Sequence, residues 1–574
     1  MQNHLNNMKK YKSIIFWTIV FAAYCIALWL TDKYIFQYFE QRQTFFADAG
    51  FIRSALGQVG GCTILLSDLI IQFFICPAAG IILTSLLLTS ISFVSYRIFR
   101  HISGKWDTAL LGLLPGAGCA LQMYDMNFQY SGIVSLLIMV LCLWGYVNVK
   151  KDLPRLICGI LMVLALFAFS GAIASLFAVS VLLIEVFTDT KGAWKFLLVP
   201  GATVVAGAFA IEAGAAADIK HLLGPFAYFT LRVGISDVAY LSWGGWGIAL
   251  LLACLRSVIR ASGKVFTCCF IAVQIAGVFC LWFFGGRTFV NKSDIFFKEL
   301  NQLARNGKWE RIIQRYGDRP SDNLLFQNYL AVALAEKGLL ADRAFDYNFQ
   351  SIRSVYVETN KTPYVSNLLG DIFYSMGELG LAQRYYFESN ESRGDYSPTC
   401  LQKLVLTNLA YGAYGVAEKY LSLLEKTLFY KGWAEKYEGL LYDDAAVEGD
   451  PVTGPLRRCI FPDNKLSGLG GLDIDFKRII RANPERPQTM QYLGTLLLLM
   501  KDIDAFMGLL EEFYGTSALG RELPRCFQQA VCVFANGDTE ILEKYNVSAE
   551  TIAEFDAFKE KRSAHNFWFF YYYQ

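Results

Sequence analysis

The chain has 574 residues, of which 54% are hydrophobic, 15% aromatic and 18% charged, and its mean hydropathy is +0.34. This composition is too apolar for a wholly soluble protein of this length and too charged for a bundle that lies entirely in a membrane. The formal net charge is only +2 and no nucleic-acid-binding motif occurs, so nucleic acid is not an expected partner.

A change of composition near Gly286 divides the chain into two halves. Before it, long apolar runs alternate with short basic loops; after it, the sequence is polar and repeats a Gly/Ala pattern. The repeat spacing is about 35 residues, the period of tetratricopeptide (TPR) repeats. We therefore expect an all-α protein with a transmembrane domain over residues 1–286 and a soluble TPR-like helical-repeat domain over residues 287–574.

The first half is expected to form a bundle of about nine transmembrane helices, because a hydrocarbon core needs about 20 apolar residues per helix. The first span follows three lysines and lacks the small-residue cleavage site of a signal peptide, so it is interpreted as an uncleaved anchor. The expected spans are Ser13–Thr31, Ala78–Tyr96, Thr108–Met123, Ser131–Val149, Leu156–Phe169, Ala172–Phe187, Phe196–Ile211, Trp243–Leu255 and Val265–Phe284.

Basic residues indicate the orientation of these spans, because Lys and Arg collect in cytoplasmic loops. With about nine spans the basic clusters alternate correctly if the N-terminus is cytoplasmic. The soluble domain then lies on the exoplasmic side, which is the periplasm for a bacterial inner membrane. The clusters are Lys9, Lys10 and Lys12; Arg97, Arg100 and Lys105; Lys150, Lys151 and Arg155; Lys191 and Lys195; and Arg256, Arg260 and Lys264.

Two apolar runs are ambiguous. Cys62–Val94 is too long for one helix and contains Pro77, so its first part is expected to lie along the outer interface as an amphipathic segment. Asp68 and Gln72, four residues apart, would share the polar face of that segment. The second run, Leu156–Phe187, is interpreted as two short spans; a single span would make the soluble domain cytoplasmic instead.

Few ionisable residues fall within the spans. Glu185 is close to a cytoplasmic end, where we expect it to reach water, and Asp32 is interpreted as an interfacial charge. Pro115-Gly116 and Pro200-Gly201 each interrupt a span, but the sequence does not show the paired broken helices of a transporter.

The second half predicts stacked helical hairpins with a concave surface for an extended partner. Asp444–Gly471, rich in Gly, Pro and Asp, is expected to be a loop between groups of repeats. The aromatic tail His565–Gln574 is either an interfacial belt or ligand platform, or a segment docked on the repeats; the docked alternative is favoured. The best repeat match is Leu369, Gly370, Phe373, Gly377, Ala382 and Tyr386, with weaker ones at Gly338 and Ala344, at Gly412, Ala417 and Leu421, and at Leu493, Gly494 and Leu497.

The order of these elements resembles the GT-C class of glycosyltransferases. In both, a first span leads into an outer loop with acidic residues, followed by an interfacial helix, many spans and an exoplasmic soluble domain. GT-C enzymes use polyprenyl-linked sugar donors, and some carry C-terminal TPR repeats. The Gly60-Gly61 turn, with Ser67-Asp68 and Gln72-Phe73-Phe74 after it, is also similar to an uncharacterised family of polytopic proteins with TPR tails.

The resemblance implies that an acidic residue of the first outer loop acts as base or metal ligand. Asp48, between Ala47 and Ala49 and near three phenylalanines, is the best positional match, and Asp125 and Glu40 are further catalytic candidates. The Asp-Asp or Glu-x-Asp pair typical of the class is absent from this loop, so the metal is unknown; Mg or Mn is a candidate cofactor. Candidate contacts to the donor phosphates are Arg232, Lys220, His221 and Arg53.

Three functions follow from this reasoning. The first is glycosyl transfer, including oligosaccharide transfer to exported proteins, from a polyprenyl-phosphate-linked glycan to a protein or glycan acceptor held by the repeats. The second is a non-catalytic membrane scaffold that recruits envelope proteins through its repeats, in which case the candidate residues are solvated loop charges. The third is a transporter or flippase with an accessory domain. Acidic residues in the first outer loop favour the first function.

Overall fold

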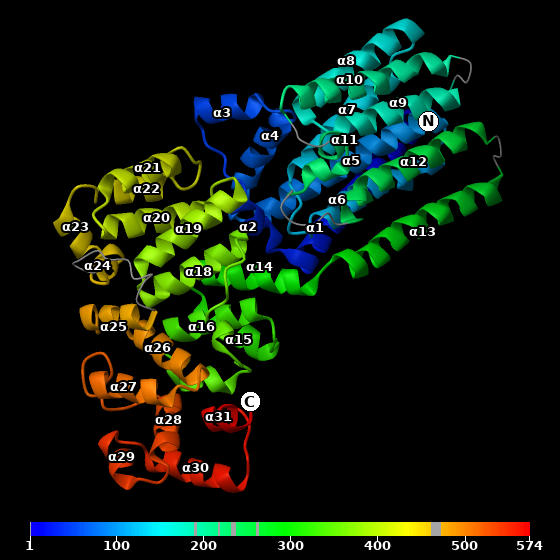
Figure 1. Cartoon of the computed structure of the whole chain (residues 1–574). Helices are drawn as coiled ribbons and strands as arrows, with labels where there is room; N and C mark the ends of the chain where they lie inside the picture. The colour runs from blue at the N-terminus through cyan, green and yellow to red at the C-terminus, as the bar shows by residue number, and fades with distance from the viewer. Residues whose placement is uncertain (1, 189–191, 216–218, 231–236, 260–262, 461–471) are drawn as a thin grey trace. The chain divides into compact units, whose positions relative to one another are not determined.

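The computed structural model describes residues 2–188, 192–215, 219–230, 237–259, 263–460 and 472–574 (Figure 1). Over these residues every regular element is a helix, apart from two isolated β-bridges, so the fold is all-α as expected. The chain divides into two compact units, Met1–Ile295 and Phe296–Gln574. Each unit is described by itself below.

The first unit is built mainly from long apolar helices connected by short 3₁₀ segments and turns. Its helices are α1 (Gln2–Asp32), α2 (Ile35–Glu40), α3 (Ala49–Leu56), α4 (Gly61–Gln72), α5 (Pro77–Ser103), α6 (Leu113–Gln122), α7 (Ser131–Val147), α8 (Asp152–Ser170), α9 (Ile173–Thr188), α10 (Leu198–Glu212), α11 (Ile219–Leu223), α12 (Leu241–Val258) and α13 (Lys264–Phe289). The 3₁₀ segments are η1 (Phe73–Ile75), η2 (Trp106–Gly112), η3 (Ala193–Leu197), η4 (Pro225–Tyr228) and η5 (Asp237–Tyr240).

Six helical segments of the described chain are long and apolar enough to cross a membrane. Three other expected spans correspond to shorter helices: α6, α7 and α9 have 10, 17 and 16 residues. The expected number of nine spans therefore stays a prediction. The six segments are Tyr11–Asp32, Pro77–Ser103, Asp152–Ser170, Ala193–Glu212, Asp237–Val258 and Lys264–Phe289.

The long apolar run Leu156–Phe187 consists of two helices, as predicted. Helix α8 ends at Ser170, and Gly171 takes φ 71° and ψ −132°, a conformation that is open to glycine and costly for other residues. Helix α9 starts two residues later and packs back against α8. Gly171 thus reverses the chain within an uninterrupted apolar sequence.

The two proline-glycine pairs do not break helices in the structure. Pro115 is the third residue of α6, and Pro200 is the third residue of α10. In the first turn of a helix a backbone N–H has no partner within the helix, so proline removes no hydrogen bond there. Each proline instead marks the point where a 3₁₀ segment passes into an α-helix.

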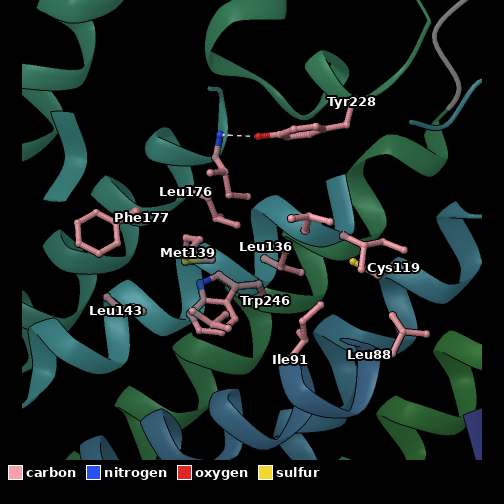
Figure 2. Close-up of a cluster of buried hydrophobic side chains, with 14 of the residues drawn as sticks. Leu88, Ile91, Cys119, Leu136, Met139, Leu143, Leu176, Phe177, Tyr228 and Trp246 are labelled. Carbon is pink, nitrogen blue, oxygen red and sulfur yellow. Dashed lines mark hydrogen bonds between the residues drawn. The ribbon is translucent and has the colours of Figure 1, made fainter. Parts of the chain in front are cut away.

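The core of the first unit lies between α5, α7, α9 and α12, which run side by side (Figure 1). Trp246 of α12 is fully buried there, and its indole N–H donates to Ser180 Oγ at 2.8 Å. Figure 2 shows Trp246 surrounded by side chains such as Leu136, Met139 and Ile91. The hydrogen bond satisfies the only polar atom of a side chain that otherwise contributes apolar surface.

The second unit is a series of mostly short helices. They are α14 (Lys292–Arg305), α15 (Trp309–Asp318), α16 (Leu324–Glu336), α17 (Leu340–Arg343), α18 (Pro363–Met376), α19 (Leu379–Arg393), α20 (Pro398–Ala410), α21 (Tyr414–Glu425), α22 (Lys431–Glu438), α23 (Asp444–Gly449), α24 (Thr453–Arg457), α25 (Leu472–Ala482), α26 (Pro487–Leu499), α27 (Ile503–Phe513), α28 (Arg525–Ala535), α29 (Thr539–Lys544), α30 (Ala549–Glu560) and α31 (Phe567–Tyr573). Two 3₁₀ turns, η6 (Ala344–Asp346) and η7 (Ile352–Ser354), precede α18.

Within the described residues of this unit, one turn recurs six times between helices. In each, a residue with positive φ is followed by a residue whose N–H donates to the carbonyl five positions back, which is the Schellman arrangement. The donor–acceptor pairs are Lys308–Leu303, Leu339–Leu334, Glu378–Phe373, Ala413–Asn408, Asp502–Leu497 and Val547–Leu542. The positive-φ residues are Gly307, Gly338, Gly377, Gly412, Lys501 and Asn546. Repeated use of one turn indicates repeated helical hairpins.

Two glycines of the predicted repeat pattern, Gly370 and Gly494, lie where helices pack closely against each other. A Cβ atom on Gly370 of α18 would lie 2.7 Å from the Tyr386 ring of α19. A Cβ atom on Gly494 of α26 would lie 2.2 Å from the Phe527 ring of α28. Both positions therefore need glycine, because a large aromatic side chain occupies the space of a side chain there.

Two expectations for the second unit have different outcomes. The prediction that Asp444–Gly471 is a loop is wrong for its first part, which forms α23 and α24; residues 461–471 lie outside the described residues. Helix α24 packs on α20, so this segment is part of the core. The aromatic tail docks on α28, in line with the favoured docked alternative, because Trp568 is buried and donates to the Gln529 carbonyl at 2.8 Å.

Candidate functional site

Connections far apart in the sequence meet at one end of the first unit. Arg42, which follows α2, donates to Thr230 Oγ1 at 2.7 Å and to the Phe128 carbonyl at 3.2 Å. Phe128 and Phe229 form an antiparallel bridge. The Gln129 N–H also donates to the Tyr228 carbonyl at 2.8 Å. These contacts join the first loop, the segment 124–130 and the segment 224–230.

The turn between α8 and α9 also lies at this end of the first unit, where it contacts Gly60. The Gly60 N–H donates to the Ala168 carbonyl at 3.0 Å. A Cβ atom on Gly60 would lie 3.4 Å from the Gly171 nitrogen, and both glycines have positive φ. The Gly60-Gly61 turn and the Gly171 turn thus lie backbone to backbone, which larger residues would prevent.

These segments line a cavity of about 490 Å³. Its wall is formed by the turn between α3 and α4, the start of α4 and the turn between α8 and α9. The other lining residues are Gln129, Ser131, Ala215, His221, Leu222 and residues 226–230. A cavity of a few hundred cubic ångströms with several polar groups has the size and lining of a small-molecule site.

Tyr228 fixes one wall of this cavity. Its hydroxyl donates to the Ser170 carbonyl at 2.7 Å and accepts the Ile173 N–H at 3.1 Å, the bond drawn in Figure 2. The Tyr228 hydroxyl therefore satisfies one backbone carbonyl at the end of α8 and one backbone N–H at the start of α9, on either side of the Gly171 turn. It ties the segment after α11 to the helix pair.

Two predicted catalytic residues bind backbone groups near themselves. Asp48 is the N-cap of α3, and its Oδ2 accepts the Gly50 N–H at 3.0 Å and the Phe51 N–H at 3.1 Å. Asp125 accepts the Asn127 N–H at 2.8 Å. These are the usual local contacts of an N-cap and an Asx turn. Neither residue lines the cavity.

The third predicted carboxylate, Glu40, is 1% exposed at the end of α2. Gln41 Nε2 donates to Glu40 Oε2 at 2.6 Å. Asp32, predicted to be an interfacial charge, is also buried, and its Oδ1 accepts the Tyr34 and Ile35 N–H groups at 3.0 and 3.2 Å. Both carboxylates are thus enclosed in protein at the first loop.

The predicted phosphate-binding residues are only partly described. His221 lines the cavity, and Arg53 is exposed in the last turn of α3. Lys220 belongs to α11, but its side chain lies outside the described residues, as does all of Arg232. Among the predicted site residues whose side chains are described, the structure brings His221 alone to the cavity wall.

The segment predicted to lie along the outer interface has a different environment. Helix α4 packs against α7 and α8, and Asp68 and Gln72 are 3% and 2% exposed. Gln43 Nε2 donates to Asp68 Oδ1 at 3.2 Å, and Gln72 Nε2 donates to the Gln43 carbonyl at 3.3 Å. The polar face is therefore buried against the first loop, because the loop supplies side-chain and backbone partners for it.

Glu185 also differs from its prediction. It is 3% exposed, and its Oε1 lies 2.8 Å from Arg155 Nη2 and 2.7 Å from the Tyr146 hydroxyl. The carboxylate is thus paired with α8 and α7 rather than hydrated. A paired charge is the usual condition under which an acidic residue is buried.

Sequence reasoning missed Arg42, Ser170 and Tyr228 as parts of this site. No local pattern marks them, since each acts through a partner on a distant segment. In the described part of the chain, no group of three or more His, Cys, Asp or Glu side chains is arranged to hold a metal ion.

The apolar helices and the polar connections at their ends define an all-helical protein with several helices able to span a membrane, consistent with a multi-pass membrane protein. The sequence matches the family of unknown function DUF6057 over residues 8–574, and the chain belongs to that family. No curated protein and no solved structure matches it.

Proposed function

We propose that the chain is a membrane glycosyltransferase of GT-C type. It would act at the exoplasmic face on a polyprenyl-linked sugar or oligosaccharide donor, including as an oligosaccharyltransferase for exported proteins. The observation that carries the proposal is the meeting of the first loop with segment 224–230, through Arg42 and Thr230, beside a cavity of about 490 Å³. A lipid-linked donor needs such a polar site next to apolar helices.

In this proposal the candidate carboxylates are Asp48, Asp125 and Glu40, with Asp48 as the base that activates the acceptor. Arg232, Lys220, His221 and Arg53 are the candidate contacts to the donor phosphates. Arg232 would bind two phosphate oxygens at once through its planar guanidinium. A divalent cation remains a candidate cofactor for neutralising the leaving pyrophosphate.

The proposed topology has about nine spans, with the short helices α6, α7 and α9 included among them. The N-terminus is cytoplasmic, and α13 carries the chain to the exoplasmic side. In a bacterial inner membrane the second unit would then be periplasmic. The basic clusters of the loops support this orientation.

The second unit is proposed to be a TPR-like solenoid that binds the protein or glycan acceptor. Its support is the recurrent Schellman turn and the glycine positions at helix crossings, such as Gly370 against Tyr386. Stacked hairpins of this kind offer a long surface for an extended partner.

The test is a transfer assay with the full chain in proteoliposomes that contain a polyprenyl-phosphate donor labelled in its sugar. We expect donor consumption by the wild type and its loss in Asp48→Asn. Asp32→Asn is the matched control, because Asp32 of the same region also accepts two backbone N–H groups and Asn can form the same hydrogen bonds. Absence of donor consumption by the wild type with peptide, glycan and water acceptors would contradict the proposal and favour the scaffold.

A further inference from the structure

Polar and apolar side chains both line the cavity described above. Its polar residues carry amides, hydroxyls and one imidazole: Gln58, Thr63, Gln129, Ser131, Ser170, His221, Tyr228 and Thr230. Apolar and aromatic surface comes from Leu222, Phe226 and Phe229. Among the described residues that line it, none carries a carboxylate, an ammonium or a guanidinium group.

Ser170 adds an independent observation that points to a ligand. The residue is 1% exposed, and its Oγ has no hydrogen-bond partner. A buried hydroxyl without a partner costs free energy, about 1–3 kcal/mol in proteins. Its backbone is fixed by Tyr228, so the side chain cannot easily move away to find another partner.

We propose that this cavity binds an uncharged, hydroxyl-rich ring, that is, a neutral sugar. Sugar hydroxyls both donate and accept, so they can satisfy amides and serine or threonine hydroxyls such as Ser170 Oγ. The apolar face of a sugar ring fits against Leu222 and the phenylalanine rings. A phosphate, by contrast, needs cationic groups or several backbone N–H donors to replace its water.

The identification of this sugar as the glycosyl part of the donor rests on the proposed function. The binding itself does not require transfer chemistry. The inference also separates two subsites: the sugar lies in the cavity, and the phosphates lie outside it. His221, expected at the phosphates, would then contact the sugar instead.

The test measures binding of four small probes to the full chain in nanodiscs, by calorimetry or ligand-observed NMR. The probes are methyl glucoside, N-acetylglucosamine, glucuronate and inorganic phosphate. We expect the two neutral sugars to bind at least about tenfold more tightly than the two anions, because an unpaired anion loses its hydration in this lining.

Ser170→Ala is the informative variant. If its hydroxyl serves a ligand, the variant should lose about tenfold in neutral-sugar affinity without a lower melting temperature, since no protein hydrogen bond is lost. Ser90→Ala is the matched control, because Ser90 Oγ bonds the Leu86 carbonyl of its own helix and is outside the cavity. Gln129→Ala is a second cavity variant and should also weaken the neutral sugars.

Tighter binding of glucuronate or phosphate than of both neutral sugars would overturn the inference. So would unchanged sugar affinity in both Ser170→Ala and Gln129→Ala. Sugar binding that responds to these variants, together with no donor consumption, would remove the transferase and leave the cavity assignment in place. Donor consumption that both variants leave unchanged would remove the cavity assignment and leave the transferase proposal in place.

Discussion

Arg256 of α12 donates two hydrogen bonds to one carboxylate oxygen of Asp107, from Nε at 3.1 Å and from Nη2 at 2.9 Å. The two side chains are only 2% and 3% exposed. Gln274 of α13 donates to the Asp107 carbonyl and accepts the Leu111 N–H, so three segments are joined around the pair. Arg256, which the sequence placed in a cytoplasmic basic loop, is thus a buried structural residue.

Removing one partner of this pair should destabilise the first unit strongly. Asp107→Ala leaves the Arg256 charge buried, so we expect a loss of about 3–5 kcal/mol in unfolding free energy. The measurement is denaturant unfolding in detergent, with Asp152→Ala as the control because Asp152 is exposed at the start of α8. The double variant Asp107→Ala/Arg256→Met should be more stable than Asp107→Ala. Equal stability of Asp107→Ala and Asp152→Ala would contradict a role for the pair.

Asp48 allows its two possible roles to be separated. Asp48→Ala removes the α3 cap and should cost about 1 kcal/mol, whereas Asp48→Asn keeps a cap oxygen and should unfold like the wild type. If Asp48 is also the base, the Asn variant should lose about 100-fold or more in transfer rate at unchanged stability. Parallel unfolding and transfer measurements check this. A fully active Asp48→Asn variant would limit Asp48 to capping.

Tyr228→Phe should lower the stability of the first unit by about 1–3 kcal/mol, since it leaves the buried Ile173 N–H without its acceptor. Tyr240→Phe is the matched control, because Tyr240 is 52% exposed. The readout is the melting temperature of the full chain in detergent. Equal shifts for the two variants would mean that the Tyr228 hydroxyl is not needed to hold the cavity wall.

Glu378 makes the stability of the second unit depend on pH. Burial, with a smaller contribution from the charge of Asp475, raises the pKa of Glu378 from 4.5 to about 7. Between these values the folded state binds more protons than the unfolded state, so the free energy of unfolding falls as pH rises. The contribution of Glu378 is fully present below about pH 4.5 and lost above about pH 7, for a change of up to about 3 kcal/mol.

Glu378→Gln should therefore be more stable than the wild type at pH 8 and should lose that advantage at pH 4.5. The amide oxygen can still accept the Leu381 N–H that caps α19. Thermal unfolding of the full chain at the two pH values checks this, with the exposed Glu550→Gln as the control. A wild type and Glu378→Gln that respond equally to pH would contradict the assignment.

Much of the helical architecture could be predicted from the sequence. The turn near Gly171 followed from the basic residues on both flanks of Leu156–Phe187, because two cytoplasmic flanks require an even number of crossings. The crossing at Gly370 and Tyr386 followed from the spacing of small and aromatic residues. These signals are local in sequence, which is why they could be recognised.

The errors have a common physical cause. The four-residue spacing of Asp68 and Gln72 makes a polar face, but spacing does not tell whether water or another segment covers it. Here Gln43 covers it. In the same way, nothing near Glu185 shows that Arg155 will reach it from α8. The cavity depends on contacts between segments more than one hundred residues apart, such as Arg42 with Thr230, so no local sequence motif predicts it.

The proposed function requires the end of the first unit that carries the cavity to lie on the exoplasmic side. Cysteine labelling in intact cells tests this directly, after the exposed residues Cys76, Cys268, Cys269 and Cys280 have been replaced by serine. A cysteine at Gln58, an exposed residue of the cavity wall, should react with an impermeant maleimide in intact cells; one at Lys150, in the loop between α7 and α8, should react only after lysis. The reverse pattern would place the cavity in the cytoplasm and contradict the proposed use of an exoplasmic lipid-linked donor.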